Sequence, residues 1–397
     1  MKKYILAAAA LFMGVSTFAQ QALWGFADVT SPEINPDKTV TFRIKAPKAI
    51  SVQVTGDMLP GRDIQTPQGV WTLPGVADLK EGKDGVWEYT TPTPIAPEFY
   101  NYNFIVDGQS MVDPNNVFIN RDVKTLTSIL YVEGDPVIDL FKVAAVPHGT
   151  VSKIWYHSTQ EGYDRRLTVY TPAGYENSGK KYPVFYLLHG MGGDEEAWYT
   201  QGRASQILDN LIAQGKAEPM IVVMTNGNIA QQAAPGESPE GFKAPDMSLP
   251  KTMEGSFENA FPEIVKFVEK TFRCKTDKNS RAIAGLSMGG FHSCHISKQY
   301  PDMFGYVGLF SAAITNDSKS PIYEDFDGKL ATQFAKKPAL YYIAIGKTDF
   351  LFQANTEYRK KLDAAGYPYV YIETEGGHIW RNWRHYLADF APRLFKK

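Results

Sequence analysis

A serine flanked by glycines follows a short apolar run in the C-terminal half of the chain. The run Ala282-Ile283-Ala284 leads into Gly285-Leu286-Ser287-Met288-Gly289, and Gly290 comes next. This G-x-S-x-G pattern predicts a strand, a tight turn and a helix, with Ser287 at the apex of a turn that its small neighbours make possible. A serine hydroxyl attacks an acyl group only when a base and oxyanion donors lie beside it, so the chain must supply both.

An aspartate and a histidine follow Ser287 in the order that this chemistry needs in such a fold. Asp349 comes directly after the apolar run at 342–345, and His378 follows the pair Gly376-Gly377, which allows a sharp loop. We expect Ser287 as nucleophile, His378 as base and Asp349 as the residue that orients the base. The alternative for Asp349 is a cap of the helix expected near Gln353.

The other histidines have simpler structural interpretations. A strand is predicted at His157 and helices at His292, His295 and His385. For the oxyanion we expect the backbone N–H of Met288 and one from the loop Leu188-His189-Gly190-Met191-Gly192-Gly193, with Met191 as the donor and His189 as a support of the loop.

Short apolar strands alternate with helical segments from residue 151 to the C-terminus. The runs at 184–188, 220–224, 282–286, 340–345 and 369–373 are typical of a buried parallel sheet, and those at 151–157 and 165–171 of an antiparallel pair that precedes it. The clearest helix is expected at 258–272. We therefore predict a doubly wound α/β domain over residues 151–397. The proline-rich segment 233–251 can be neither strand nor helix, and we expect it to flank the site.

The first part of the chain has a different pattern. Residues 1–19 have a basic start, an uncharged apolar stretch and small residues at Thr17-Phe18-Ala19, which predicts an export signal cleaved after Ala19. Between 20 and 135, short β-rich runs at 39–45, 50–55, 86–90, 100–106 and 126–132 alternate with turn residues and predict a β-sandwich. Residues 136–150 are expected to be a linker.

Composition excludes several classes of function. The formal net charge of −2 does not favour nucleic acid or an anionic membrane surface. No segment after the signal is long and apolar enough to span a membrane. No cysteine lies near the cleavage site, which argues against a lipid anchor. Cys274 and Cys294, the 2 cysteines, lack metal-site spacing, and they can form a disulfide or remain free buried thiols. We therefore expect no zinc site.

The N-terminal region resembles a known module. Its pieces are Thr41 to Pro47, Val52 to Asp57, Gly85-Val86-Trp87-Glu88, Tyr100 to Phe104, Val106-Asp107-Gly108 and Asp113-Pro114. They are similar to the immunoglobulin-like module of carbohydrate-binding module family 48, which precedes many enzymes that act on glycans. In that family the module binds glycan in some members and only packs against the enzyme in many, so Trp71 and Trp87 are more simply core residues than a sugar platform.

The C-terminal region resembles the esterase D-like branch of α/β-hydrolases, which includes carbohydrate esterase family 1. The resemblance rests on Val146 to Gly149, Val169 to Tyr175, Tyr182 to Gly190, Gly285 to Gly290, and His378 with Trp380 and Trp383. It implies a triad at Ser287, Asp349 and His378, no metal or cofactor, and release of ferulate or acetate from xylan. The segment 233–251 does not map onto the family pattern.

The leading hypothesis is an exported serine esterase that removes feruloyl groups from plant arabinoxylan or its oligosaccharides. An aromatic acyl group needs an apolar slot, for which Trp198, Trp380, Phe350 and Phe242 are the candidates. The alternatives are an acetyl xylan esterase, a siderophore esterase of the enterochelin type, and a glycan-binding protein without activity. The sequence does not indicate the oligomeric state.

Overall fold

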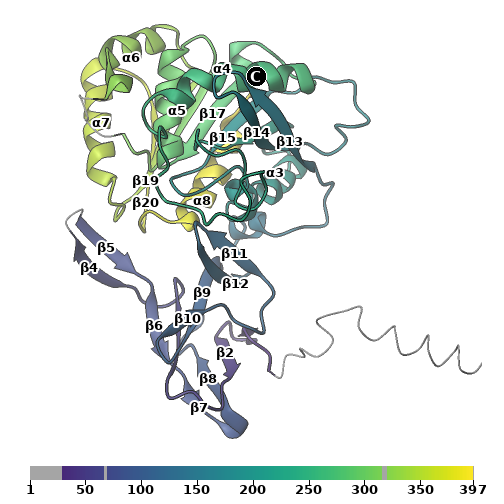
Figure 1. Ribbon diagram of the computed structural model, residues 1–397, viewed down its shortest axis with the longest axis vertical. Helices are drawn as coiled ribbons and strands as arrows, with labels where there is room; N and C mark the ends of the chain where they lie inside the picture. The colour runs from purple at the N-terminus through teal and green to yellow at the C-terminus, as the bar shows by residue number, and fades with distance from the viewer. Residues whose placement is uncertain (1–28, 67–68, 315–319, 397) are drawn as a thin grey trace, which may run out of the picture.

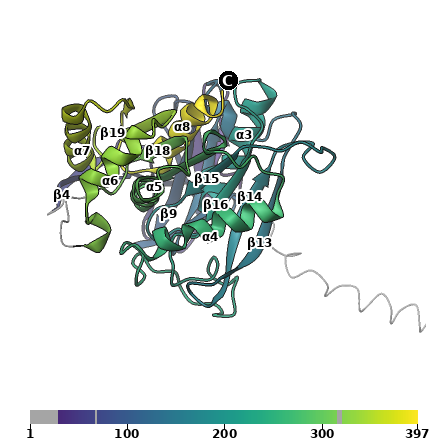
Figure 2. The same cartoon turned by 90° about the horizontal axis from the view of Figure 1, so that it is seen from above.

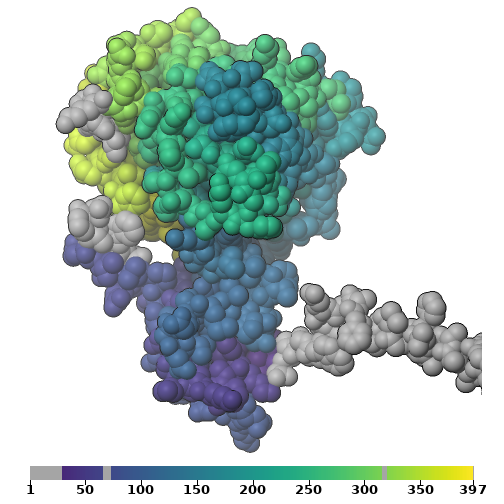
Figure 3. All heavy atoms as spheres, in the orientation of Figure 1, coloured from purple at the N-terminus to yellow at the C-terminus, as the bar shows by residue number. Residues whose placement is uncertain are grey.

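The chain folds into a larger α/β part and a smaller sheet-rich part. The computed structural model describes residues 29–66, 69–314 and 320–396, so the predicted signal at 1–19 lies outside the described residues. Figure 3 shows the sheet-rich part, in purple and blue, as a lobe below the larger teal-to-yellow lobe. Figure 1 shows the strands of the lower lobe reaching up to the sheet and helices above it.

The α/β part is organised around an eight-stranded sheet with the order β13-β14-β16-β15-β17-β18-β19-β20. Strands β15 to β20 run parallel, and β13 and β14 form an antiparallel edge. The bounds are β13 Thr150–Ser158, β14 Tyr163–Thr171, β15 Val184–Leu188, β16 Ile221–Thr225, β17 Arg281–Leu286, β18 Tyr306–Phe310, β19 Leu340–Gly346 and β20 Val370–Thr374. The predicted parallel sheet is therefore present, and β18 is a strand that the sequence reading missed.

Helices cover both faces of this sheet, as the view in Figure 2 shows for α3 and α4. Alternate residues of each strand point to opposite faces, which is why the central strands are apolar throughout. In β17, Ile283 packs with helices α4 to α7, whereas Ala282 and Ala284 pack with α3 and α8. The bounds are α2 Ala197–Thr200, α3 Ala204–Ala213, α4 Ser256–Thr271, α5 Met288–Gln299, α6 Phe326–Ala335, α7 Phe352–Ala365 and α8 Trp380–Phe390.

The sheet-rich part contains two sheets around one apolar core. Their orders are β1-β2-β8-β7 and β11-β12-β9-β3-β6, with β10 paired to β9, and β4 and β5 form a separate hairpin. Trp87 is buried in this core and donates its Nε1–H to Ala46 O at 3.0 Å, whereas the side chain of Trp71 lies outside the described part. The bounds are β1 Glu33–Ile34, β2 Val40–Lys45, β3 Val52–Gly56, β4 Arg62–Thr66, β5 Gly69–Leu73, β6 Gly75–Asp78, β7 Lys80–Glu81, β8 Val86–Thr90, β9 Glu98–Val106, β10 Gln109–Met111, β11 Ile119–Asp122 and β12 Thr125–Val132.

Buried polar contacts join the two parts. The Arg384 guanidinium of α8 is fully buried and donates to Phe99 O of β9 at 2.7 Å and to Gln201 O at 3.1 Å. His385 Nε2 lies 3.0 Å from Glu98 Oε2. The predicted linker is itself packed, because the 3₁₀ helix Ile138–Phe141 buries three apolar side chains against the α/β part. The sheet-rich part is thus attached to the α/β part by more than the chain connection.

Two features of the α/β part bear on the sequence predictions. Cys274 and Cys294 are free and buried, so the disulfide is absent. Of the helices that the structure describes, none has the length and apolar character needed to cross a membrane.

Candidate active site

Ser287 occupies the sharp turn between β17 and α5. Its backbone has φ 53° and ψ −115°, a conformation that non-glycine residues rarely adopt. Two hydrogen bonds hold it there, because the Ser287 N–H donates to Phe310 O at 2.9 Å and the Ser287 carbonyl accepts from Ala313 N–H at 3.0 Å. Neighbouring strand β18 and the segment that follows it therefore fix the strained turn that presents the serine.

The glycines around Ser287 are required by close packing. A Cβ at Gly289 would lie 2.4 Å from Leu188 O, and one at Gly285 would lie 2.4 Å from the Gly289 carbonyl carbon. A Cβ at Gly290 would lie 2.6 Å from the Cβ of Ala312. Helix α5 can start this close to the strand ends only because these three positions have no side chain.

His378 and Asp349 form a hydrogen-bonded pair at the ends of adjacent parallel strands. Asp349 follows β19 and His378 follows β20, and His378 Nδ1 lies 3.0 and 2.9 Å from the two carboxylate oxygens of Asp349. The Asp349 side chain is 0% exposed and also accepts the Leu351 N–H at 2.9 Å. A buried carboxylate at Nδ1 favours the tautomer with the proton on Nδ1, which leaves Nε2 free to accept a proton.

Aromatic rings fix the orientation of the imidazole further. The His378 ring lies 4.5 Å from the ring of Phe350 and 4.9 Å from that of Trp383, the latter edge to face. Trp383 is itself held, because its Nε1–H donates to Ser311 Oγ at 3.2 Å.

The loop after β15 lies next to the serine, where oxyanion donors are expected. A Cβ at Gly190 would be 3.3 Å from Ser287 Cβ, and Met191 lines the same cavity as Ser287. His189 supports this loop: its Nε2 accepts the Gly227 N–H at 2.9 Å, and its Nδ1 lies 2.7 Å from Gly190 O. Burial lowers the pKa of His189 to about 4, so the ring stays neutral and can make both contacts.

Ser287 and His378 open into one cavity of about 640 Å³. Both parts of the chain line it. The sheet-rich part contributes Asp57, Leu59, Gly61, Leu73, Pro74, Asp122 and Val123, and the α/β part contributes Met247, Phe350, Trp380, Arg381 and Trp383 among others. The site is therefore a junction between the two parts, and no motif in the sequence indicated the contribution of the first part.

The four residues expected in an acyl slot have different locations. Phe350 and Trp380 line the cavity. Trp198 is 1% exposed and donates its Nε1–H to Leu188 O at 2.8 Å, so it packs beneath Trp380 as a core residue. Phe242 is 98% exposed and does not line the cavity. The segment 233–251 reaches the cavity instead through Met247, so the expectation was wrong for Trp198 and Phe242.

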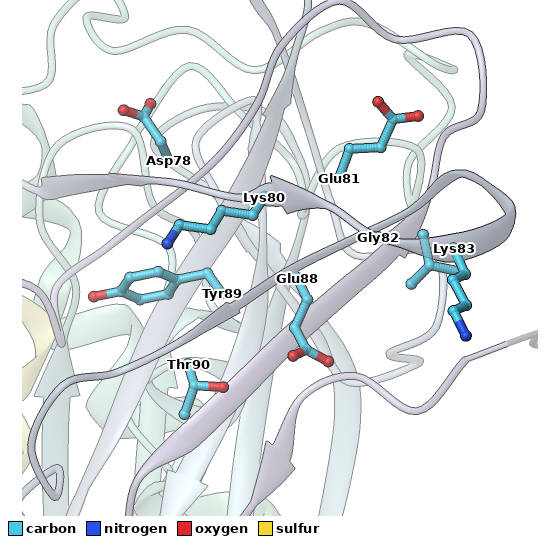
Figure 4. A pocket seen from close by; sticks show the side chains of 9 residues that line it. Asp78, Lys80, Glu81, Gly82, Lys83, Glu88, Tyr89 and Thr90 are labelled. Atoms are coloured by element: carbon cyan, nitrogen blue, oxygen red, sulfur yellow. The ribbon is translucent and has the colours of Figure 1, made fainter.

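A second cavity lies within the sheet-rich part and contains none of these groups. It has a volume of about 580 Å³ and is lined by charged and polar side chains of β6 to β8, among them Lys80, Glu88 and Tyr89. Figure 4 shows these side chains around the hollow. Within the described residues, no group of three or more His, Cys, Asp or Glu residues could hold a metal ion.

Known proteins are similar to this chain in sequence. The chain is 32% identical over 376 residues to an endo-1,4-β-xylanase/feruloyl esterase of Xylanibacter ruminicola, which covers 92% of this chain but 46% of that protein. The alignment with an esterase of Mycobacterium tuberculosis covers 56% of that protein. The chain therefore spans about half the length of these curated relatives.

Solved structures resemble this chain in fold. A ferulic acid esterase of Anaeromyces mucronatus, solved in complex with ferulic acid, is 28% identical with a TM-score of 0.54 over 64% of this chain and 93% of that chain. The enterobactin esterase of Shigella flexneri is 16% identical with a TM-score of 0.63 over 89% of this chain and 92% of that chain, which is a likeness of fold alone. The larger part is thus an α/β-hydrolase. The model of the family described as putative esterase matches residues 158–394, more than half of the chain, and the chain belongs to this family.

Proposed function

We propose that the protein is a serine carboxylic-ester hydrolase in which Ser287, His378 and Asp349 form the triad. One observation carries the proposal: a serine on a strained turn opens into the same cavity as a histidine whose Nδ1 is held by a buried carboxylate. Ser287 Oγ attacks the ester carbonyl while His378 Nε2 takes its proton. The N–H groups of Met288 and Met191 bind the oxyanion.

The remaining steps use the same groups. His378 returns the proton to the leaving alcohol, which departs and leaves an acyl group on Ser287. Water, deprotonated by His378, then attacks the acyl carbonyl, and the carboxylic acid is released as Ser287 recovers its proton. No step requires a metal or a cofactor.

The proposed substrate is a feruloyl ester of arabinoxylan. Phe350 and Trp380 give the cavity aromatic walls that suit a hydroxycinnamoyl group, and relatives in both comparisons are named as feruloyl or ferulic acid esterases. Two carboxylates, Asp57 and Asp122, lie on the cavity wall with a single arginine, Arg381, among the lining residues. Such a wall disfavours an anionic iron chelate and suits a neutral sugar. Export through residues 1–19 is part of the same proposal.

The experiment compares Ser287→Ala with the unchanged chain on methyl ferulate and on acetylated xylan. We expect kcat of the variant to fall by about 10⁴ to 10⁶ with substrate binding retained. Unchanged turnover would refute the triad. Fast acetate release without ferulate release by the unchanged chain would instead leave a serine esterase with a different acyl specificity.

A further inference from the structure

Arg121 extends from the sheet-rich part to the loop beside the nucleophile. It lies in β11, next to the turn that joins β11 to β12, and its Nη1 donates to Val123 O of that turn at 2.9 Å. Its Nη2 donates to Asp194 Oδ2 of the α/β part at 2.5 Å. Figure 1 shows the β11–β12 hairpin at the top of the lower lobe, against the larger one. The guanidinium thus joins the β11–β12 hairpin to a loop 73 residues further along the chain.

Asp194 is a buried carboxylate that needs this partner. Its side chain is 2% exposed, and its Oδ1 accepts the Glu196 N–H at 2.9 Å. The next residue, Glu195, is also buried, and it pairs with Arg166 at 2.7 Å. Because Glu195 is buried and lies beside the negative charge of Asp194, its pKa is raised. Each carboxylate has its own arginine, and the arginine of Asp194 comes from the sheet-rich part.

Asp194 ends the loop that carries the expected oxyanion donor. The loop runs from Gly190 to Asp194 and is closed by a hydrogen bond from Gly193 N–H to Gly190 O at 3.1 Å. The β11–β12 turn touches it a second time, because a Cβ at Gly192 would lie 2.6 Å from Val123 Cγ2. On the inner side, Asn228 donates to Gly193 O at 2.7 Å. The loop is therefore held between the α/β core and the hairpin.

We propose that Arg121 is a positioning residue for ester hydrolysis: through Asp194 it holds the 190–194 loop so that the Met191 N–H points at the developing oxyanion. Arg121 does not line the cavity, so it acts through the loop and not on the substrate. This inference rests on the proposed function. A donor aimed at the oxyanion acts in the transition state more than in the ground state, so its displacement lowers kcat and changes KM little.

The test uses Arg121→Gln in the full chain, with Lys124→Gln as the matched control because Lys124 is an exposed cation on the same turn. We expect R121Q to lower kcat on methyl ferulate by about 10- to 100-fold, less than the loss of a whole oxyanion donor, and to keep KM within about twofold. Phenylboronic acid, whose tetrahedral adduct with Ser287 fills the oxyanion site, should bind more weakly by a similar factor. Affinity for ferulate, the product acid, should not change.

Two further variants separate positioning from folding. Arg121→Lys keeps the charge and should recover part of kcat. The double variant R121Q/D194N keeps an acceptor for the Glu196 N–H without an unpaired buried charge, so it should be more active than R121Q. Circular dichroism and the thermal midpoint verify folding, and if R121Q does not fold, R121K and the double variant give the same comparison.

Three results have distinct meanings. Equal kcat in R121Q and K124Q, with S287A inactive, would overturn the positioning role and leave the proposed function intact. A higher KM with unchanged boronate affinity would assign Arg121 to substrate binding and overturn the proposal as well. Full activity of S287A would refute the proposed function itself.

Discussion

Asp349→Asn tests the orienting carboxylate with the smallest change of shape. In the structure Asp349 Oδ1 accepts the Leu351 N–H at 2.9 Å, and His378 Nδ1 lies 3.0 Å from Oδ1 and 2.9 Å from Oδ2. The Leu351 N–H requires an acceptor, so the oxygen of an asparagine must remain at the Oδ1 position. The NH₂ group then faces His378 Nδ1. The asparagine oxygen at the Oδ1 position still lies 3.0 Å from Nδ1, but the facing NH₂ group repels a proton there. The balance therefore shifts to the tautomer with the proton on Nε2, which cannot accept one from Ser287.

The expected magnitude follows from the lost base. A histidine held in the wrong tautomer costs about 10⁴ in kcat, or about 5.4 kcal/mol of transition-state stabilisation. KM for methyl ferulate should change by less than about threefold, since the cavity walls are untouched. Release of ferulate at pH 7 gives both constants. The control is Asp327→Asn, because Asp327 is an exposed acid that pairs with Lys361 on the surface at 2.6 Å. A D349N variant with more than a tenth of the kcat of D327N would refute the tautomer argument.

Three further changes give distinct results. Phe350→Ala should raise KM for methyl ferulate by about 10-fold through lost apolar contact but leave KM for methyl acetate within about twofold; equal effects on both esters would contradict an aromatic acyl slot. Trp198→Phe leaves Leu188 O without its donor and should lower the free energy of unfolding by about 1 to 3 kcal/mol in urea titrations; a large change in KM would contradict its place in the core. Burial opposes ionisation of Glu98, but hydrogen bonds from His385 and the Phe99 N–H outweigh it and lower the pKa of Glu98. The ionised form of Glu98 therefore stabilises the fold above the usual carboxyl pKa, and this contribution is lost as pH falls through the lowered value. Glu98→Gln should make the unfolding midpoint less pH-dependent in that acidic range. Parallel curves of midpoint against pH for the two chains would contradict this role.

The sequence predicted much of the α/β part because its signals are local. Continuous apolar runs mark β15, β16, β17 and β19, each to within a residue or so of its bounds. Ser287, Asp349 and His378 could be singled out because each follows such a run or a glycine pair. Strand β18, Tyr306–Phe310, was missed: it is only five residues long and has a glycine in the middle.

Contacts between distant segments could not be predicted. Nothing near Asp57 in the sequence indicates a cavity built mostly by residues more than a hundred positions later. Trp198 and Phe242 were assigned to the acyl slot because their side chains are aromatic, although an aromatic ring packs equally well in a core. In the structure Trp198 donates a hydrogen bond to the backbone carbonyl of Leu188 in the core, and Phe242 of the proline-rich segment is exposed to solvent. The immunoglobulin-like fold and glycan binding of the first part stay predictions.

The fully buried Arg384 has a consequence for the history of the chain. Its guanidinium uses a carbonyl of β9, and burial lowers its pKa to about 10. An esterase half copied by recombination without its sheet-rich neighbour would lose the Phe99 carbonyl and the Glu98 carboxylate from around this cation and would expose it to water. Water would solvate the guanidinium, but the apolar surface packed beside it on α8, the helix that also holds Trp383 against His378, would be exposed as well. The two halves are therefore expected to be inherited together.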